Sequence, residues 1–144
     1  MEICSLASGS SGNCSYVGNS NTNLLVDTGV SCRKIENGLN SIDVDPSKLH
    51  GVLITHEHTD HINSLGTLAK RYNIPVYGTR ETLKAILSKK KYKNLSQQRL
   101  IAVEPDKEFL INDIIVEPFS ISHDAVNPVC YTFKSNGSKI GMAN

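Results

Sequence analysis

The stretch Thr55–His61, THEHTDH, contains three of the five histidines of the chain together with two acids. In extended backbone, residues i and i+2 point to the same side, so His56 and His58 can direct two imidazoles at one metal ion. The side chains of Asp60 and His61 would point to a neighbouring position, where a second metal ion could bind. Two ions held close together can share one water and convert it to hydroxide near neutral pH. Histidine and carboxylate at this density therefore predict a metal site rather than a solvated loop with nothing bound.

This stretch is expected to lie between a strand and a helix. The preceding residues 50–55, HGVLIT, form an apolar, β-branched run that is typical of a buried strand. Residues 62–72 repeat apolar side chains at helical spacing, and Thr59 is the expected N-cap, which puts Asp60 and His61 in the first helical turn. The end of a strand offers a backbone that is rigid yet exposed, as a metal site requires.

The rest of the chain predicts an α+β fold in one layered domain, with its chemistry on loops. Short apolar runs bounded by glycine and asparagine indicate a meander of three strands over 2–8, 14–19 and 22–29. Helical spacing predicts helices over 31–42 and 81–92, separated by a strand over 74–79. Further strands are expected at 99–103, 108–111, 113–122, 129–134 and 139–143, with hairpin turns in LINDII and KSNGSK.

Composition narrows the class of protein. The net charge of +1 gives no global attraction to nucleic acid or to a membrane. No apolar run approaches the ~20 residues that span a bilayer, and MEICSLASGS lacks the basic and apolar segments of a signal peptide. The four cysteines form no C-x-x-C pair. We therefore expect reduced thiols and a cytoplasmic protein that does not bind a membrane.

One segment is locally basic. Lys89, Lys90, Lys91 and Lys93 lie in a single stretch that contains no acid. Such a stretch could contact a nucleic-acid backbone through its phosphates, and Tyr92 within it could stack on a base. The alternative is a solvated helix end, where lysine interacts favourably with the helix dipole.

Four motifs together carry a resemblance to a known family. THEHTDH after an apolar strand resembles the signature of the metallo-β-lactamase superfamily of metal-dependent hydrolases, and LLVDTG at 24–29 resembles an earlier motif of that superfamily. SLASGSSGN at 5–13 and ISHDAVNPVCYTF at 121–133 narrow the match. They resemble the YycJ-like group (also called WalJ or VicX), bacterial cytoplasmic proteins regarded as DNA exonucleases. The similarity extends over essentially the whole chain.

The resemblance implies a fold, a substrate and a ligand set. The fold would be the N-terminal half of an αββα sandwich, with a mixed β-sheet and flanking helices, and the substrate would be DNA. The cofactor would be Zn²⁺ or Mn²⁺, as one or two ions. By this resemblance, His56, His58 and His123 would bind a first ion, whose site would be the more readily occupied. Asp60 and His61 would bind a second ion, and Asp60 would also be catalytic. Asp27 would support the loop that carries the metal ligands.

The sequence also departs from the superfamily pattern. Superfamily members continue past a strand like 139–143 to an aspartate that bridges both ions and then to a last histidine, whereas this sequence ends at Asn144. We therefore expect a metallo-β-lactamase-like domain over 1–144 that is C-terminally incomplete, with a weakened second site. Phosphodiester hydrolysis needs both ions, so activity of the short chain is expected to be impaired.

Alternatives to a DNA exonuclease stay open. One is a hydrolase of the same superfamily that acts on a small thioester, lactone or phosphodiester. Another is a truncated remnant that holds a metal without turnover. The incomplete sheet also predicts a homo-oligomer, because the strand over 138–143, with Ile140 and Met142, would otherwise leave an apolar face and an unpaired edge in water.

Overall fold

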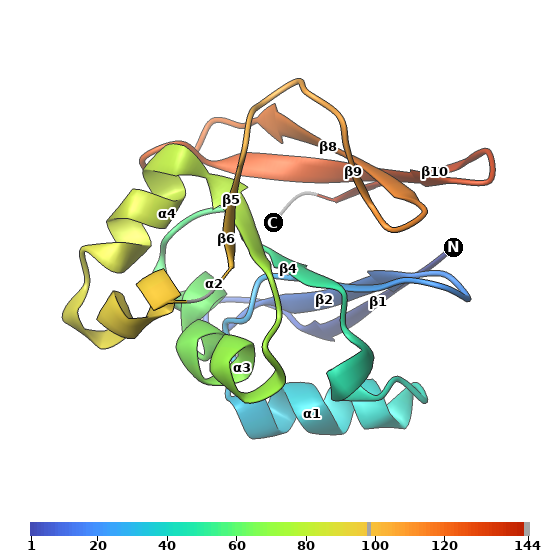
Figure 1. The fold of residues 1–144 in the computed structure, drawn as a ribbon, viewed down its shortest axis with the longest axis horizontal. Coiled ribbons are helices and arrows are strands. Elements are labelled where there is room, and N and C mark those ends of the chain that lie inside the picture. The colour runs from blue at the N-terminus through green and yellow to red at the C-terminus, as the bar shows by residue number, and fades with distance from the viewer. Residues whose placement is uncertain (98, 143–144) are drawn as a thin grey trace.

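One parallel strand near the centre of a β-sheet leads directly into the histidine motif. The computed structural model describes residues 1–97 and 99–142, and they form two β-sheets stacked face to face (Figure 1). The first sheet runs in chain order through β1 (Glu2–Ala7), β2 (Cys14–Gly18), β3 (Asn23–Val26), β4 (Gly51–Leu53), β5 (Val76–Thr79) and β6 (Leu100–Val103). The first three strands pair antiparallel and the last four pair parallel, so the sheet is mixed.

The second sheet is antiparallel throughout. Its spatial order is β10-β9-β8-β7, and the strands are β7 (Phe109–Ile111), β8 (Ile114–Ser120), β9 (Val129–Ser135) and β10 (Ser138–Met142). Two tight hairpin turns connect the strands in pairs, one joining β7 to β8 and the other joining β9 to β10. Both turns contain asparagine with positive φ, at Asn112 (53°) and Asn136 (50°), followed in the second turn by Gly137 (81°). The hairpins predicted in LINDII and KSNGSK are confirmed.

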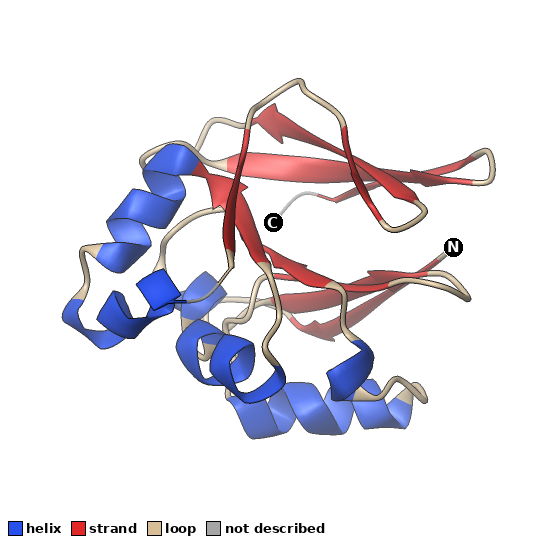
Figure 2. Ribbon diagram, in the orientation of Figure 1, coloured by secondary structure: helices blue, strands red, loops and turns tan. Residues whose placement is uncertain are grey.

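The helices lie on the outer side of the first sheet, and the second sheet covers its other face (Figure 2). They are α1 (Cys32–Ser41), α2 (Thr59–Ile62), α3 (Leu65–Tyr72) and α4 (Arg80–Leu87), with 3₁₀ turns η1 (Pro46–Lys48) and η2 (Lys90–Gln97). Among the described residues, no helix covers the outer face of the second sheet (Figure 2). The predicted α+β architecture, a mixed sheet with flanking helices, is confirmed.

Alternation along the central strands builds two separate cores. Leu25 and Ile54 pack toward the helices, whereas Leu24 and Leu53 pack against the second sheet. All four side chains are fully buried. Burial on both faces of the sheet explains why residues 50–55 form a nearly continuous apolar run in the sequence.

Three predicted element boundaries are wrong. The helix expected over 62–72 is two helices, α2 and α3, and the N-cap of α2 is His58 rather than Thr59. The helix expected over 81–92 ends at Leu87, and a 3₁₀ segment follows from Lys90. That segment packs Tyr92 and Leu95 into the core, and tertiary packing therefore overrides the helical spacing. The last predicted strand is present as β10, although its final residue, Ala143, lies outside the described residues.

Candidate metal centre

The carboxyl ends of β3 and β4 meet at one edge of the first sheet because the two strands run parallel. Asp27 follows β3 directly, and the Thr55–His58 segment follows β4. The Asp27 N–H donates to the carbonyl oxygen of Leu53 at 2.8 Å, and its backbone adopts a left-handed conformation with φ of 64°. The chain turns sharply there, and the Asp27 carboxylate comes to lie beneath the loop that carries the histidines.

Asp27 fastens that loop with three hydrogen bonds. Its Oδ1 accepts from the Thr55 N–H at 2.8 Å, and its Oδ2 accepts from the Thr55 hydroxyl at 2.7 Å and from His61 Nδ1 at 2.6 Å. The Asp27 side chain is fully buried. A buried carboxylate with three charge-assisted hydrogen bonds holds its donors rigidly, so Thr55 and His61 have little freedom to move.

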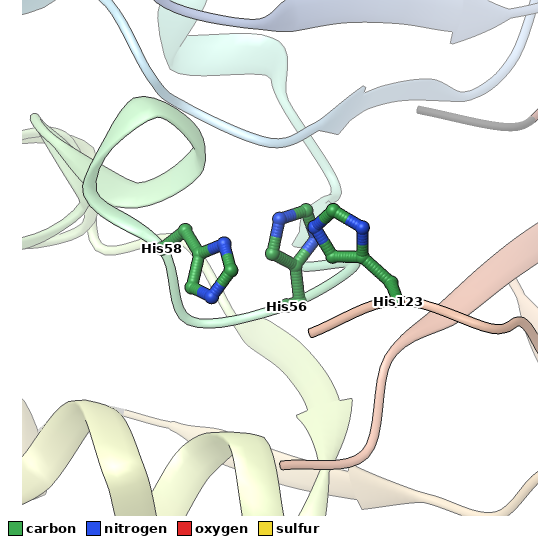
Figure 3. Close-up of side chains that lie close together, drawn as sticks. All are labelled: His56, His58 and His123. Atoms are coloured by element: carbon green, nitrogen blue, oxygen red, sulfur yellow. The ribbon is translucent and has the colours of Figure 1, made fainter. Parts of the chain in front are cut away.

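Three imidazoles converge above this support (Figure 3). One ring nitrogen from each of His56, His58 and His123 can be chosen so that all three lie within 4.8 Å of one another. His56 and His58 project from the loop after β4, and His123 projects from the loop after β8 (Figure 3). The ring centroids of His56 and His123 are 4.5 Å apart, which places the two loops in contact. A zinc ion with three imidazole ligands and one open position would fit this donor set.

The protonation state of His56 suits metal binding. Burial, reinforced by the neighbouring His61, lowers the pKa of His56 to about 4, so its imidazole is neutral at physiological pH. Neutral imidazole is the form that binds a metal ion. Burial alone would also lower the pKa of His61, but the hydrogen bond and the charge of Asp27 outweigh burial and raise it.

Asp60 and His61 form a second group of donors beside the first. Asp60 Oδ2 lies 3.7 Å from His61 Nε2, and the His61 ring centroid lies 3.9 Å from that of His56. His61 Nδ1 is committed to Asp27, so in the neutral ring the lone pair is on Nε2. The two ligands expected for a second ion thus lie together, immediately next to the three imidazoles.

Asn13, from the SGSSGN turn, contacts both of these donors. Its side-chain Nδ2 lies 3.2 Å from His61 Nε2 and 3.4 Å from Asp60 Oδ2, and its backbone N–H donates to the Asp60 carbonyl oxygen at 2.8 Å. The Gly29 N–H donates to the Asn13 carbonyl oxygen. A Cβ at Gly29 would lie 1.7 Å from the Asp60 carbonyl oxygen, so only glycine allows the two segments to approach this closely.

Two lysines of the basic run form hydrogen bonds with backbone carbonyl oxygens near the candidate site. Lys89 Nζ donates to the Glu57 carbonyl oxygen at 2.7 Å, and Lys91 Nζ donates to the Asn63 carbonyl oxygen at 3.0 Å. Lys90, Lys91 and Lys93 are exposed, and Lys89 is half-buried. Tyr92 is only 4% exposed, and its hydroxyl donates to the Ile62 carbonyl oxygen at 2.9 Å, so the expectation that it could stack on a base is wrong. Contact of the four lysines with nucleic acid stays a prediction.

A comparison with models of protein families shows to which family this chain belongs. The model of the metallo-beta-lactamase superfamily matches residues 7–132. The chain belongs to this superfamily. Two curated relatives are exodeoxyribonuclease YycJ of Bacillus anthracis, 39% identical over 137 residues, and exodeoxyribonuclease WalJ of Streptococcus pneumoniae, 41% identical over 128 residues. The matched residues make up 95% and 89% of this chain but 51% and 48% of those proteins. The chain therefore spans about half the length of the curated relatives it matches.

Solved structures confirm the fold. A subclass B3 metallo-beta-lactamase with an active-site glutamic acid superimposes with a TM-score of 0.78 at 13% identity, and the match covers 97% of this chain and 57% of that one. The metallo-beta-lactamase GOB-18 of Elizabethkingia meningoseptica gives a TM-score of 0.73 at 12% identity, over 90% of this chain and 53% of that one. The prediction of the N-terminal half of the metallo-β-lactamase sandwich is confirmed. Within the described residues, the structure contains no helix long and apolar enough to cross a membrane.

The structure places residues around the candidate metal site that the sequence did not reveal. Asn13 was part of a motif used only for the resemblance, and Glu57 was noted only as an acid within the histidine motif. Thr55 was taken only as the end of a strand, yet its hydroxyl joins Asp27 to His56 Nδ1, 3.0 Å away. His50, the remaining histidine, lies outside the cluster, and its Nδ1 accepts from the Asn23 N–H. Apart from the contact between the neighbours Thr55 and His56, these contacts join segments that are distant in sequence, so no local pattern reveals them.

Proposed function

We propose that this chain carries the first-ion half of a metal-dependent phosphodiesterase that removes nucleotides from DNA ends. The observation that carries the proposal is the convergence of His56, His58 and His123, supported from below by Asp27. The substrate comes from the relatives, two of which are named exodeoxyribonucleases and resemble nearly the whole of this chain. The exposed lysines Lys90, Lys91 and Lys93, with Lys89 beside them, would add attraction for the phosphate backbone.

Each predicted ligand has a role in this proposal. His56, His58 and His123 would bind the first ion. Asp60 and His61 would supply two of the ligands of a second ion. Zn²⁺ and Mn²⁺ both accept such nitrogen and oxygen donors. When bound, the metal lowers the pKa of a coordinated water and screens the negative charge of the phosphate. Asp60 would also orient the water that attacks phosphorus, which is the catalytic role proposed for it.

The remaining residues prepare the site. Asp27 and Thr55 orient the histidine rings, and Asn13 holds Asp60 and His61 in place through its backbone and its side chain. Fixing these side chains before the substrate binds spares the reaction the cost of ordering them later.

A nuclease assay with Mn²⁺ and Zn²⁺ tests the proposal. The 144-residue chain is expected to show little turnover on end-labelled DNA, whereas a chain extended by the second half of the Bacillus anthracis relative should degrade it. Asp60→Ala in the extended chain should abolish degradation, because it removes a carboxylate from the reacting centre. Hydrolysis of a small thioester or lactone by the extended chain, without action on DNA, would contradict the proposal.

We further infer that the protein works in the cytoplasm, where its DNA substrate and reduced thiols would both be found. All four cysteines, within the part of the chain that the structure describes, are free thiols. The DNA-directed names of the relatives support the same compartment.

We also propose that the 144-residue chain forms a homo-oligomer through the second sheet. The outer face of that sheet exposes Leu110, of which 66% is accessible, beside Ile115 in the pairing of β7 with β8. Ile140, expected on this face, instead packs against the core between the sheets. Covering apolar surface gains about 25 cal/mol per Å², so a partner copy should bind there. Light scattering at micromolar concentration should detect an oligomer, and a monomer with a cooperative melt would contradict this.

A further inference from the structure

Glu57 lies between two of the proposed ligands, His56 and His58, and contacts two other segments of the chain. Its carboxylate Oε2 accepts from the Val126 N–H at 3.1 Å, in the loop that carries His123. Its backbone carbonyl oxygen accepts from Lys89 Nζ at 2.7 Å, between α4 and η2. Glu57 therefore links three segments that surround the candidate metal site.

The other attachments of the His123 loop lie on its far side. Asn127 is held by α4, since its carbonyl oxygen accepts from the Thr79 and Thr82 hydroxyls and its side chain donates to Glu81. The Val129 N–H donates to the Thr55 carbonyl oxygen. These contacts fix the end of the loop that enters β9. Among the hydrogen bonds of the described residues, the one from the Val126 N–H to Glu57 ties the loop, three residues after His123, to a side chain from the loop of His56 and His58.

We propose that Glu57 is a positioning residue that presets the distance between His123 and the pair His56 and His58. The proposal rests on the metal site of the proposed function, but it concerns metal affinity and not the reaction. His123 is exposed, and its loop would otherwise have to be ordered when a metal ion binds. Holding the loop beforehand removes that entropic cost from the binding step.

The length of the side chain matters in this arrangement. The Glu57 carboxylate has one oxygen, Oε2, on the Val126 N–H, whereas Oε1 is buried without a hydrogen-bond partner among the described residues. Glutamine can present the same carbonyl acceptor without the charge. Aspartate keeps the charge, but it is one methylene shorter and cannot reach Val126 from the same backbone position. The two substitutions therefore separate reach from charge.

Zinc affinity and amide exchange in the 144-residue chain test the proposal. Glu57→Ala and Glu57→Asp should each weaken Zn²⁺ binding about 10- to 100-fold in competition with a chromogenic chelator. In the metal-free protein, the Val126 N–H should exchange with solvent at least about tenfold faster in both variants, because its acceptor is gone. Glu57→Gln should keep the affinity within about threefold of the wild type, because an amide oxygen still accepts the bond.

Glu81→Ala is the matched control, because Glu81 is a carboxylate that binds the same loop one residue further on, through Asn127. It should leave zinc affinity within about threefold of the wild type, since the Thr79 and Thr82 bonds to Asn127 remain. Wild-type affinity in Glu57→Asp would overturn the proposal, because charge alone would then suffice. An equal loss in Glu81→Ala would also overturn it. A wild-type chain that binds no zinc would instead contradict the proposed function.

Discussion

Replacing His58 with alanine is expected to remove most of the metal that the chain retains after desalting. His58 supplies one of the three ring nitrogens that lie within 4.8 Å of one another, and the other two come from His56 and His123. Two imidazoles leave a zinc ion under-coordinated, so the affinity should fall on the order of 100-fold. Elemental analysis should find about one ion per wild-type chain and well under half of that in the variant.

His50→Ala is the control for this experiment. It removes the histidine that directly precedes β4, but the His50 ring accepts from the Asn23 N–H and lies outside the cluster. Its metal content should match that of the wild type. Two tightly held ions per wild-type chain would show that Asp60 and His61 bind a second ion more strongly than two donors should. Unchanged metal content in His58→Ala would remove His58 from the ligand set.

The part of this site that the sequence alone predicts is the part that is local. His56 and His58 are two residues apart on an extended segment, so their common direction follows from strand geometry. The buried strand before them was recognisable from its apolar run, and the structure confirms it as β4 with its flanking residues. His123 required the family resemblance, because no periodicity indicates that a loop after β8 returns to a loop after β4.

The contacts that hold the ligands could not be predicted, for a physical reason. Asn13 reaches Asp60 across 47 residues, and Glu57 reaches Val126 across 69. Such pairs depend on the register of the strands and on the residue at which each strand ends and its loop begins. A polar residue in a turn has the same appearance in the sequence whether it contacts water or a metal ligand.

The predicted end of the helix over 81–92 is wrong for a related reason. The segment 81–92 has helical spacing, yet α4 ends at Leu87, and the chain bends so that Tyr92 enters the core. The Tyr92 hydroxyl then donates to the Ile62 carbonyl oxygen at the end of α2. Burial of one aromatic side chain is worth more than continuation of an exposed, lysine-rich helix by one turn.

The second large effect is expected at Asp27, whose carboxylate sets the tautomers of two histidines. Because Oδ2 accepts the Thr55 hydroxyl proton, the Thr55 oxygen is left to accept from His56 Nδ1–H, which lies 3.0 Å away. The same Oδ2 accepts from His61 Nδ1–H. Both rings therefore present the lone pair of Nε2 to a metal ion.

Asp27→Ala should lower the free energy of unfolding by about 3–5 kcal/mol, because it leaves buried donors of Thr55 and His61 without their acceptor. That loss is a large part of the ~5–15 kcal/mol that stabilises a typical domain. Urea unfolding of the metal-free chain measures it. Thr28→Val is the control, since the buried Thr28 hydroxyl has no hydrogen-bond partner among the described residues and its replacement should cost far less.

Asp27→Asn separates the tautomer effect from the stability effect. Asparagine tolerates the positive φ of 64° at this position, and its Oδ1 can still accept from the Thr55 N–H, so the variant should fold. Its Nδ2 would donate where the carboxylate accepted, so the Thr55 hydroxyl would turn to donate to His56 Nδ1 and place the ring proton on Nε2. Zinc affinity should then fall about 10- to 100-fold. Nitrogen-15 NMR of the imidazoles should show His56 changing from the Nδ1–H to the Nε2–H tautomer. An unchanged tautomer with unchanged zinc affinity would mean that Asp27 supports the loop only by its packing and its bond to the Thr55 backbone.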